Sequence, residues 1–260
     1  MTTATSLRML LKSFRLPTFA GNYEDLARKA EQEAITYERY LHELAQMEAY
    51  DRHNRKIEVL LKRSGLPREK TLGVFDQNRL PKKVRSILPT LCEGSFLGRA
   101  ENVLAFGNPG TGKTHLLCGI AHELIRRGHA VLFTSAAMLV QRLLIAKRDL
   151  RLSQELKKLD KFEAVLIDDI GYIQQDREEM EVLFTLLAER YERRSVMITT
   201  NLVFSKWEQI FKDPMTTAAA VDRLVHHSVI LELNLKRSYR ADMALQKMDS
   251  NPASEEGRDQ

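Results

Sequence analysis

The sequence predicts an α/β protein in which a parallel five-stranded sheet carries helices on both faces, preceded by a small all-helical domain. Apolar segments of strand length alternate with longer segments whose apolar residues recur at helical spacing. This alternation is typical of a parallel sheet, because each helix returns the chain to the start of the next strand. The second observation is a glycine-rich loop between the first strand and the helix after it. The strands are expected at residues 102–106, 130–135, 162–167, 195–200 and 229–233.

The loop at residues 107–114 reads GNPGTGKT, which fits the G-x-x-x-x-G-K-T pattern of a phosphate-binding loop. Its glycines let successive backbone N–H groups point inward at anionic oxygens. We expect Lys113 to reach the β- and γ-phosphates of a nucleoside triphosphate and Thr114 to ligate Mg²⁺. A glycine-rich turn with an unrelated lysine is the weaker alternative. The residues expected to bind the nucleotide are Gly107, Asn108, Pro109, Gly110, Thr111, Gly112, Lys113, Thr114 and His115.

Polar residues follow two further strands directly: Asp168 and Asp169 end the third strand, and Asn201 follows the fourth. The carboxyl ends of parallel strands share one edge of a sheet, where ligands bind. We expect Asp168 to hold Mg²⁺, through water, and Asp169 to orient or polarise the attacking water. Asn201 would hydrogen-bond the γ-phosphate or that water. Ordinary turn residues are the alternative for all three.

Length and composition set broad limits. The 260 residues are 43% hydrophobic, enough for a sizeable core. No apolar run approaches 18 residues and the amino end lacks a signal-peptide pattern, so no membrane span is expected. Two distant cysteines favour a reducing, cytoplasmic setting, and the seven histidines show no metal-ligand spacing. A net charge of +5 permits nucleic-acid binding without requiring it.

Four regions are expected along the chain. Residues 1–66 form the helical domain, with a basic amphipathic segment ended by Pro17 and then helices at 23–46 and 47–64. Residues 67–98 are a linker whose own helix either packs on the next domain or lies against the nucleotide base. The nucleotide-binding domain follows at 99–240, and residues 241–260 are a polar, disordered tail.

Two helical regions, 47–64 and 136–159, are rich in basic residues, and the second breaks near Asp149. Their charges are either contacts with the phosphates of double-stranded DNA or the ordinary solvated faces of helices. The candidate DNA contacts are Arg142, Lys147, Arg148 and Lys56.

Three stretches, ENVLAFGNPGTGKTHLL at 101–117, AVLIDDIGY at 164–172 and ITTNL at 198–202, resemble the AAA+ ATPases of the IstB/DnaC group. This group includes the transposition helpers of insertion sequences, bacterial helicase loaders and replication initiators. The similarity to IstB covers nearly the whole chain. The resemblance implies that the loop is Walker A, that Asp168 and Asp169 are Walker B, and that Asn201 is sensor 1.

The resemblance also implies an arginine finger, and Arg223 matches its place within Asp222-Arg223-Leu224. The finger would act across a subunit boundary in an ATP-dependent homo-oligomer, a ring or a spiral. A surface ion pair is the alternative for Arg223. The family places transposase and DNA contacts in the amino-terminal domain, and initiator relatives carry an extra helix at the equivalent of 136–159.

The chain departs from the wider AAA+ pattern in two ways. Asp169 stands where many members carry glutamate, so we expect slow, regulatory hydrolysis. Few residues follow Tyr239, so the lid domain is expected to be truncated or absent, and Arg237 and Arg240 are weak sensor 2 candidates.

The predicted function is an ATP-dependent DNA-binding ATPase that assembles on target DNA and recruits or activates a transposase. The alternative is a helicase-loader-like adaptor for DNA replication, which would grip a replicative helicase with its amino-terminal helices. A small-molecule kinase is disfavoured, because no acceptor-binding pocket is recognisable in the sequence.

Overall fold

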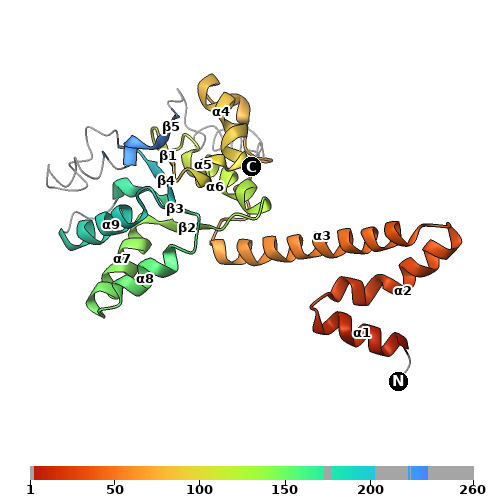
Figure 1. The fold of residues 1–260 in the computed structure, drawn as a ribbon. Helices are drawn as coiled ribbons and strands as arrows, with labels where there is room; N and C mark the ends of the chain where they lie inside the picture. The colour runs from red at the N-terminus through yellow and green to blue at the C-terminus, as the bar shows by residue number, and fades with distance from the viewer. Residues whose placement is uncertain (1–2, 173–176, 203–221, 223, 234–260) are drawn as a thin grey trace, which may run out of the picture. The chain divides into compact units, whose positions relative to one another are not determined.

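A computed structural model describes residues 3–172, 177–202, 222 and 224–233 of the chain (Figure 1). The chain divides into two compact units, residues 1–59 and 60–260, which are described separately. The described helices of the first unit are α1 (Thr3–Ser13), α2 (Pro17–Gln32) and α3 (Tyr37–Ser64), the last of which runs on into the second unit.

The predicted helix boundary at residues 46 and 47 is wrong. Helix α3 passes through it without a break, and the chain turns instead at residues 33–36, where Ala34 has a φ of 50°. No glycine or proline lies between residues 37 and 64, so nothing local ends the helix there. The prediction that Pro17 ends the preceding segment is also wrong, since α1 ends at Ser13 and Pro17 begins α2, where proline suits the first helical turn.

Glu48 of α3 caps the start of α2 within the first unit. Its carboxylate accepts hydrogen bonds from the backbone N–H of Thr18 at 2.9 Å and of Phe19 at 3.4 Å, and from Arg52 Nε at 2.8 Å. Only 5% of the Glu48 side chain is exposed. One buried carboxylate therefore satisfies free N–H groups at the helix start and joins two helices.

Glu48→Gln is expected to destabilise the first unit by about 2 kcal/mol at neutral pH. Burial alone would raise the pKa of Glu48, but hydrogen bonds from Arg52, Thr18 and Phe19 lower it overall. A depressed pKa in the folded state stabilises above the carboxyl's unfolded pKa, and this stabilisation is lost as the pH falls through the folded value. Thermal unfolding of the whole chain between neutral and acid pH tests this.

The control for that experiment is Glu43→Gln. Glu43 also lies on α3, but among the described residues its ion pair is the i,i+4 pair with Arg39 at 3.1 Å. Its loss is expected to change stability by less than about 0.5 kcal/mol. If wild type and Glu48→Gln lost stability in parallel on acidification, Glu48 would not be the source of the acid sensitivity.

The second unit is built on a five-stranded parallel sheet, as predicted. Its strands are β1 (Asn102–Phe106), β2 (Val131–Ser135), β3 (Ala164–Asp168), β4 (Ser195–Thr200) and β5 (Ser228–Glu232). They lie in the order β2-β3-β4-β1-β5, and every neighbouring pair is parallel. After β1 the chain crosses to β2, which is an outermost strand of the sheet. Strands β4 and β3 therefore lie between β1 and β2, although β1 and β2 are consecutive in the chain.

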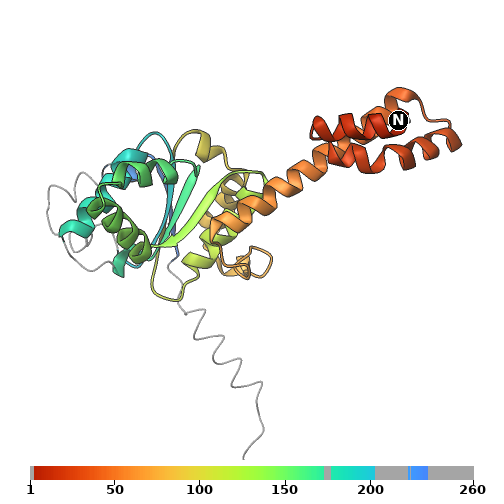
Figure 2. The same ribbon diagram turned by 90° about the horizontal axis from the view of Figure 1, so that it is seen from below.

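Helices cover both faces of this sheet (Figure 2). The remaining described helices are η1 (Gln77–Arg79), α4 (Lys82–Glu93), α5 (Ser95–Gly98), α6 (Lys113–Arg126), α7 (Ala136–Arg148), α8 (Leu152–Leu159), η2 (Ile170–Tyr172) and α9 (Arg177–Arg190). Residues of α7 and α9 share one buried apolar cluster with β1, β3 and β4, and α6 packs with α4 and against the strands. The expected break near Asp149 is confirmed, since Leu150 has a φ of 56°.

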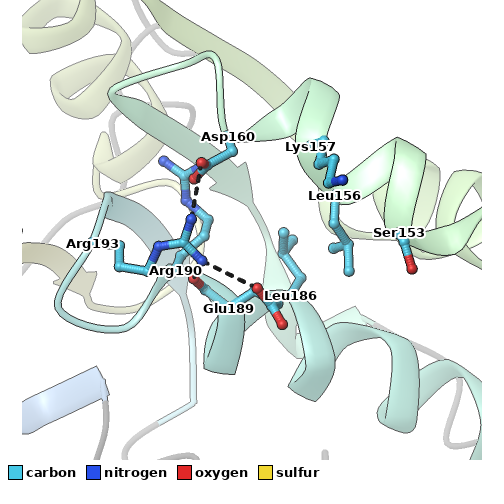
Figure 3. Close-up of a pocket in the computed structure, with 8 residues that line it drawn as sticks. All are labelled: Ser153, Leu156, Lys157, Asp160, Leu186, Glu189, Arg190 and Arg193. Carbon is cyan, nitrogen blue, oxygen red and sulfur yellow. Dashed lines mark hydrogen bonds and ion pairs between the residues drawn. The ribbon is translucent and has the colours of Figure 1, made fainter.

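A buried arginine fastens α9 to the rest of the second unit. The Arg190 guanidinium donates to the carbonyl oxygens of Leu159 at 3.1 Å, Phe162 at 3.0 Å and Ser195 at 2.9 Å, and the residue is 2% exposed. Burial lowers its pKa to about 10. It lines a cleft of about 230 Å³ between α8 and α9, where Arg193 bridges Asp160 and Glu189 (Figure 3).

Arg190→Met is expected to destabilise the second unit by roughly 3 kcal/mol, because it removes the donors of several buried carbonyl groups. Urea denaturation of the whole chain followed by circular dichroism measures the loss. Arg193→Met is the matched control, since its ion pairs with Asp160 and Glu189 are exposed and each is expected to contribute under about 1 kcal/mol. Equal midpoints for the two variants would contradict the fastening role of Arg190.

Candidate nucleotide site

The loop between β1 and α6 has the backbone that its glycines predict. Gly107, Gly110 and Gly112 have φ values of 153°, 79° and 89°. A Cβ atom at Gly107 would lie 2.5 Å from the carbonyl oxygen of Leu233, just after β5. Glycine is therefore required at Gly107, and the loop is held where β1 ends beside β5.

Lys113 is the first residue of α6 and folds back over this loop. Its Nζ donates to the carbonyl oxygens of Gly107 at 2.8 Å and Asn108 at 3.0 Å, and the residue is 9% exposed. The ammonium group is thus already positioned inside the curl of the loop. The N-terminal end of a helix, with its partial positive charge, adjoins the same place.

Thr114 and Asp168 meet at the carboxyl edge of the sheet, as predicted. The Thr114 hydroxyl donates to Asp168 Oδ1 at 2.7 Å, and the Thr199 hydroxyl donates to the same oxygen at 2.6 Å. The sheet order explains this meeting, because β4 lies between β1 and β3. A hydroxyl and a carboxylate oxygen beside an anion-binding loop are a donor set that fits Mg²⁺.

Asp169 and Asn201 also lie at the carboxyl ends of the strands, after β3 and β4. Asp169 is half-buried, has a φ of 63°, and donates its backbone N–H to Thr199 Oγ1 at 2.8 Å. Asn201 Oδ1 is buried and accepts no hydrogen bond from the described part of the chain. A Cβ atom at Gly171 would lie 2.4 Å from that oxygen, so the turn after Asp169 packs directly against Asn201.

The linker packs on α6, the helix that carries Lys113. His115 Nε2 lies 3.0 Å from the Thr71 carbonyl oxygen, and His122 Nε2 lies 3.0 Å from that of Pro67. A Cβ atom at Gly119 would lie 2.6 Å from Leu72 Cδ2, so this mid-helix glycine is required for the close approach. The expected packing role of the linker is confirmed, whereas a contact with the nucleotide base stays a prediction.

An aromatic side chain of the linker also reaches the phosphate loop. The Phe75 ring lies 5.1 Å from that of His115, between ring centres, and a Cβ atom at Gly112 would lie 3.0 Å from it. Sequence reasoning missed Gly119 and His122 as supports of the site. An isolated glycine inside an otherwise regular helical pattern was the available signal.

Three of the four candidate DNA contacts are engaged in ion pairs. Arg142 pairs with the buried Glu155 of α8, Lys147 pairs with Glu181 at 2.8 Å, and Arg148 pairs with Asp149 at 3.3 Å. The Arg142 pair joins α7 to α8, so its structural role is clear. The fourth candidate, Lys56, is exposed on α3.

Other predicted features lie outside the described residues: Arg223, Arg237, Arg240 and the tail at 241–260. The neighbours of Arg223 are described, and Asp222 is exposed while Leu224 is buried. Within the described ranges, no helix has both the length and the apolarity to span a membrane.

Glu192, His226 and His227 gather at the opposite edge of the sheet, just before β4 and β5. One ligand atom from each lies within 4.8 Å of the other two, and all three residues are exposed. The histidine spacing in the sequence did not reveal this cluster, because Glu192 is distant along the chain. It is separate from the edge that carries Asp168.

Comparison with known proteins identifies close relatives. The chain matches the IstB-like ATP-binding protein family over residues 9–247. It is 42% identical over 241 residues to an insertion-sequence protein of Sinorhizobium fredii, covering 92% of the chain and 80% of the relative. It is 36% identical over 235 residues to a protein of insertion sequence IS21 from Pseudomonas aeruginosa, covering 90% and 88%. The names of both relatives describe ATP binding.

Solved structures share the fold at low sequence identity. DnaA from Aquifex aeolicus, bound to AMPPCP, has a TM-score of 0.57 and 18% identity, covering 75% of this chain and 58% of that one. The DnaC helicase loader has a TM-score of 0.51 and 18% identity, covering 58% and 88%. At this identity the likeness concerns the fold, which is the predicted AAA+ fold.

Proposed function

Because the chain belongs to the IstB-like ATP-binding protein family, we propose that it is an ATPase of insertion-sequence transposition. It binds ATP with Mg²⁺, assembles on double-stranded target DNA as a homo-oligomer, and recruits or activates a transposase. The observation that carries the proposal is the meeting of Thr114, Asp168 and Thr199 beside the phosphate loop, at 2.7 Å and 2.6 Å. Relatives at 42% and 36% identity come from insertion sequences and support the transposition setting.

The phosphate loop and Lys113 bind the triphosphate. Phosphate oxygens compete with the Gly107 and Asn108 carbonyl oxygens for the Lys113 ammonium, and they carry more negative charge. The loop N–H groups supply further donors. Binding therefore requires only a local exchange of acceptors around a lysine that is already in place.

Thr114 and Asp168 are the residues that would hold Mg²⁺, Thr114 through its hydroxyl and Asp168 through water. A Mg²⁺ ion held there would supply positive charge that offsets the negative charge developing during phosphoryl transfer. Asp168 Oδ1 now accepts from two hydroxyl groups, which keeps the carboxylate turned toward Thr114. The donor set is thus oriented before the ligands arrive.

Asp169 and Asn201 act on the water that attacks the γ-phosphate. Asp169 orients this water and accepts its proton as the new P–O bond forms and the bond to the ADP oxygen breaks. Asn201 Oδ1, buried and with no donor from the described residues, accepts a hydrogen bond from the same water. The Asp169 side chain is one methylene shorter than glutamate, about 1.5 Å, which favours slow hydrolysis.

Slow hydrolysis suits a protein whose ATP-bound state is its working state. ATP at the subunit boundary, contacted by Arg223 of a neighbouring copy, would stabilise the oligomer on DNA, and hydrolysis would dissolve it. Arg148 is the clearest of the candidate DNA contacts to test, because its side chain is 76% exposed and its partner Asp149 is 43% exposed. Arg142 is a poor choice, since its substitution would leave the buried Glu155 with only Lys158 as its described ion-pair partner.

The proposal is tested by the affinity for duplex DNA in the presence of ATP, ADP or neither. Tighter binding with ATP, weakening as salt is added, is the expected result. Equal affinity in the three conditions would contradict nucleotide control. Recovery of a replicative helicase, and not of the transposase, in a pulldown with the purified chain would favour the helicase-loader alternative, for which the structural likeness to DnaC supplies only the fold.

A further inference from the structure

Thr199 contacts both Walker B aspartates at once. It is the penultimate residue of strand β4 and is 1% exposed. The sequence pattern predicted no role for it. Its hydroxyl donates to Asp168 Oδ1 at 2.6 Å, and its oxygen accepts the backbone N–H of Asp169 at 2.8 Å. A hydroxyl has one proton to donate, so this arrangement uses that proton on Asp168 and a lone pair on Asp169.

The two bonds do different things. The bond to Asp168 opposes rotation of its carboxylate, because Thr114 at the start of α6 and Thr199 near the end of β4 then hold the same oxygen. The bond to Asp169 holds a backbone with a φ of 63°, in the left-handed region that residues other than glycine adopt less readily. Without the hydroxyl, one carboxylate is freer to turn and the other loses an anchor for its strained backbone.

Thr199 also links the aspartates to Asn201, which lies two residues farther along the same chain segment. Together with the β3–β4 pairing, this buried hydroxyl therefore helps to position Asp169 relative to Asn201. A backbone hydrogen-bond ladder alone would fix the strands but not the Asp168 side chain.

We propose that Thr199 is a positioning residue that sets the geometry of Asp168 and Asp169 for the Mg²⁺-dependent reaction. This inference rests on the proposed ATPase function. Residues that orient a metal-holding side chain typically change metal affinity or activity by roughly 10- to 100-fold when altered. Effects of that size are expected here without a loss of phosphate-loop binding, because Lys113 donates to the loop carbonyl oxygens of Gly107 and Asn108, whereas Thr199 bonds the aspartates.

The test is Thr199→Val, which keeps the branched shape and removes the hydroxyl. We expect kcat to fall roughly 10- to 100-fold. The Mg²⁺ concentration that gives half of the Mg²⁺-dependent increase in ATP affinity should rise roughly 10-fold. The affinity for ATP measured in EDTA, without Mg²⁺, should not change. Thr199→Ser, which restores the hydroxyl, should recover most of both. Recovery by serine separates positioning from a loss of packing.

The matched control is Thr200→Val. Thr200 is the next residue, is fully buried, and accepts the Leu202 N–H at 3.1 Å instead of bonding an aspartate. It should retain the wild-type Mg²⁺ dependence. Wild-type behaviour of Thr199→Val, equal defects in both valine variants, or failure of Thr199→Ser to recover would each overturn the inference. If wild type hydrolyses no ATP, the proposed function fails, and the Mg²⁺ dependence of ATP affinity still decides the role of Thr199.

Discussion

Replacing Lys113 with methionine should abolish productive ATP binding and lower ATP hydrolysis roughly 10³-fold. This change removes the ammonium group but keeps an unbranched apolar side chain at a residue that is only 9% exposed. Without it, the charge that meets the β- and γ-phosphates, both before and during bond breaking, is lost. Phosphate release and the affinity for a fluorescent ATP analogue measure the two effects.

Lys157→Met is the control for this variant. Lys157 is exposed on α8 of the same unit and lies away from the phosphate loop, beside the α8–α9 cleft (Figure 3). It should hydrolyse ATP at the wild-type rate. Retained hydrolysis in Lys113→Met, with its circular dichroism spectrum unchanged, would mean that residues 107–114 are not the catalytic phosphate loop.

Arg223→Ala should lower hydrolysis by roughly 10³-fold while leaving ATP binding to the isolated chain nearly unchanged, if Arg223 acts as an arginine finger from a neighbouring copy. Arg223 lies outside the described residues, so this role rests on the motif Asp222-Arg223-Leu224 and on family membership. The sharpest measurement mixes two inactive variants, Arg223→Ala and Lys113→Met, and follows phosphate release.

Mixing should restore activity, because an Arg223→Ala copy still supplies a working phosphate loop and a Lys113→Met copy still supplies the arginine. In a head-to-tail assembly of equal parts, about a quarter of the boundaries combine both intact groups. Each variant alone, at the same total concentration, is the control. An inactive mixture that nevertheless assembles would contradict a finger acting between subunits.

The local parts of the nucleotide site were predictable from the sequence. The spacing within residues 107–114 determines the loop. Asp168 is the last residue of its strand, and Asp169 and Asn201 follow a strand directly. A parallel sheet brings such positions to one edge whatever the identity of the side chains between them. The order of strands then sets β4 beside β3, which explains why Thr199 reaches Asp168 across 31 residues of sequence.

The features that the sequence did not reveal depend on partners far along the chain. Arg190 binds the Leu159 carbonyl across 31 residues, and Glu48 caps Thr18 across 30. Backbone carbonyl and N–H groups carry no side-chain signature, so hydrophobic periodicity cannot show which buried charge will meet them. The turn at residues 33–36 was missed for a related reason, since its left-handed residue is Ala34 rather than a glycine.

The basic residues of α7 illustrate a third limit. Their density predicts either DNA contacts or a solvated face, and the pattern holds no information on ion pairing. Arg142 is instead bound to Glu155, 13 residues away on the next helix. The number of basic residues along a helix therefore indicates a DNA-binding surface only if the residues that already form ion pairs within the protein are left out of the count.

Light scattering of the protein on duplex DNA, with ATP, ADP or no nucleotide, tests most directly whether ATP controls assembly on DNA. Wild type should form large DNA-bound assemblies only with ATP, and Arg223→Ala should fail to form them under the same conditions. Assemblies of equal size in all three conditions, or no binding to DNA in any of them, would contradict the account.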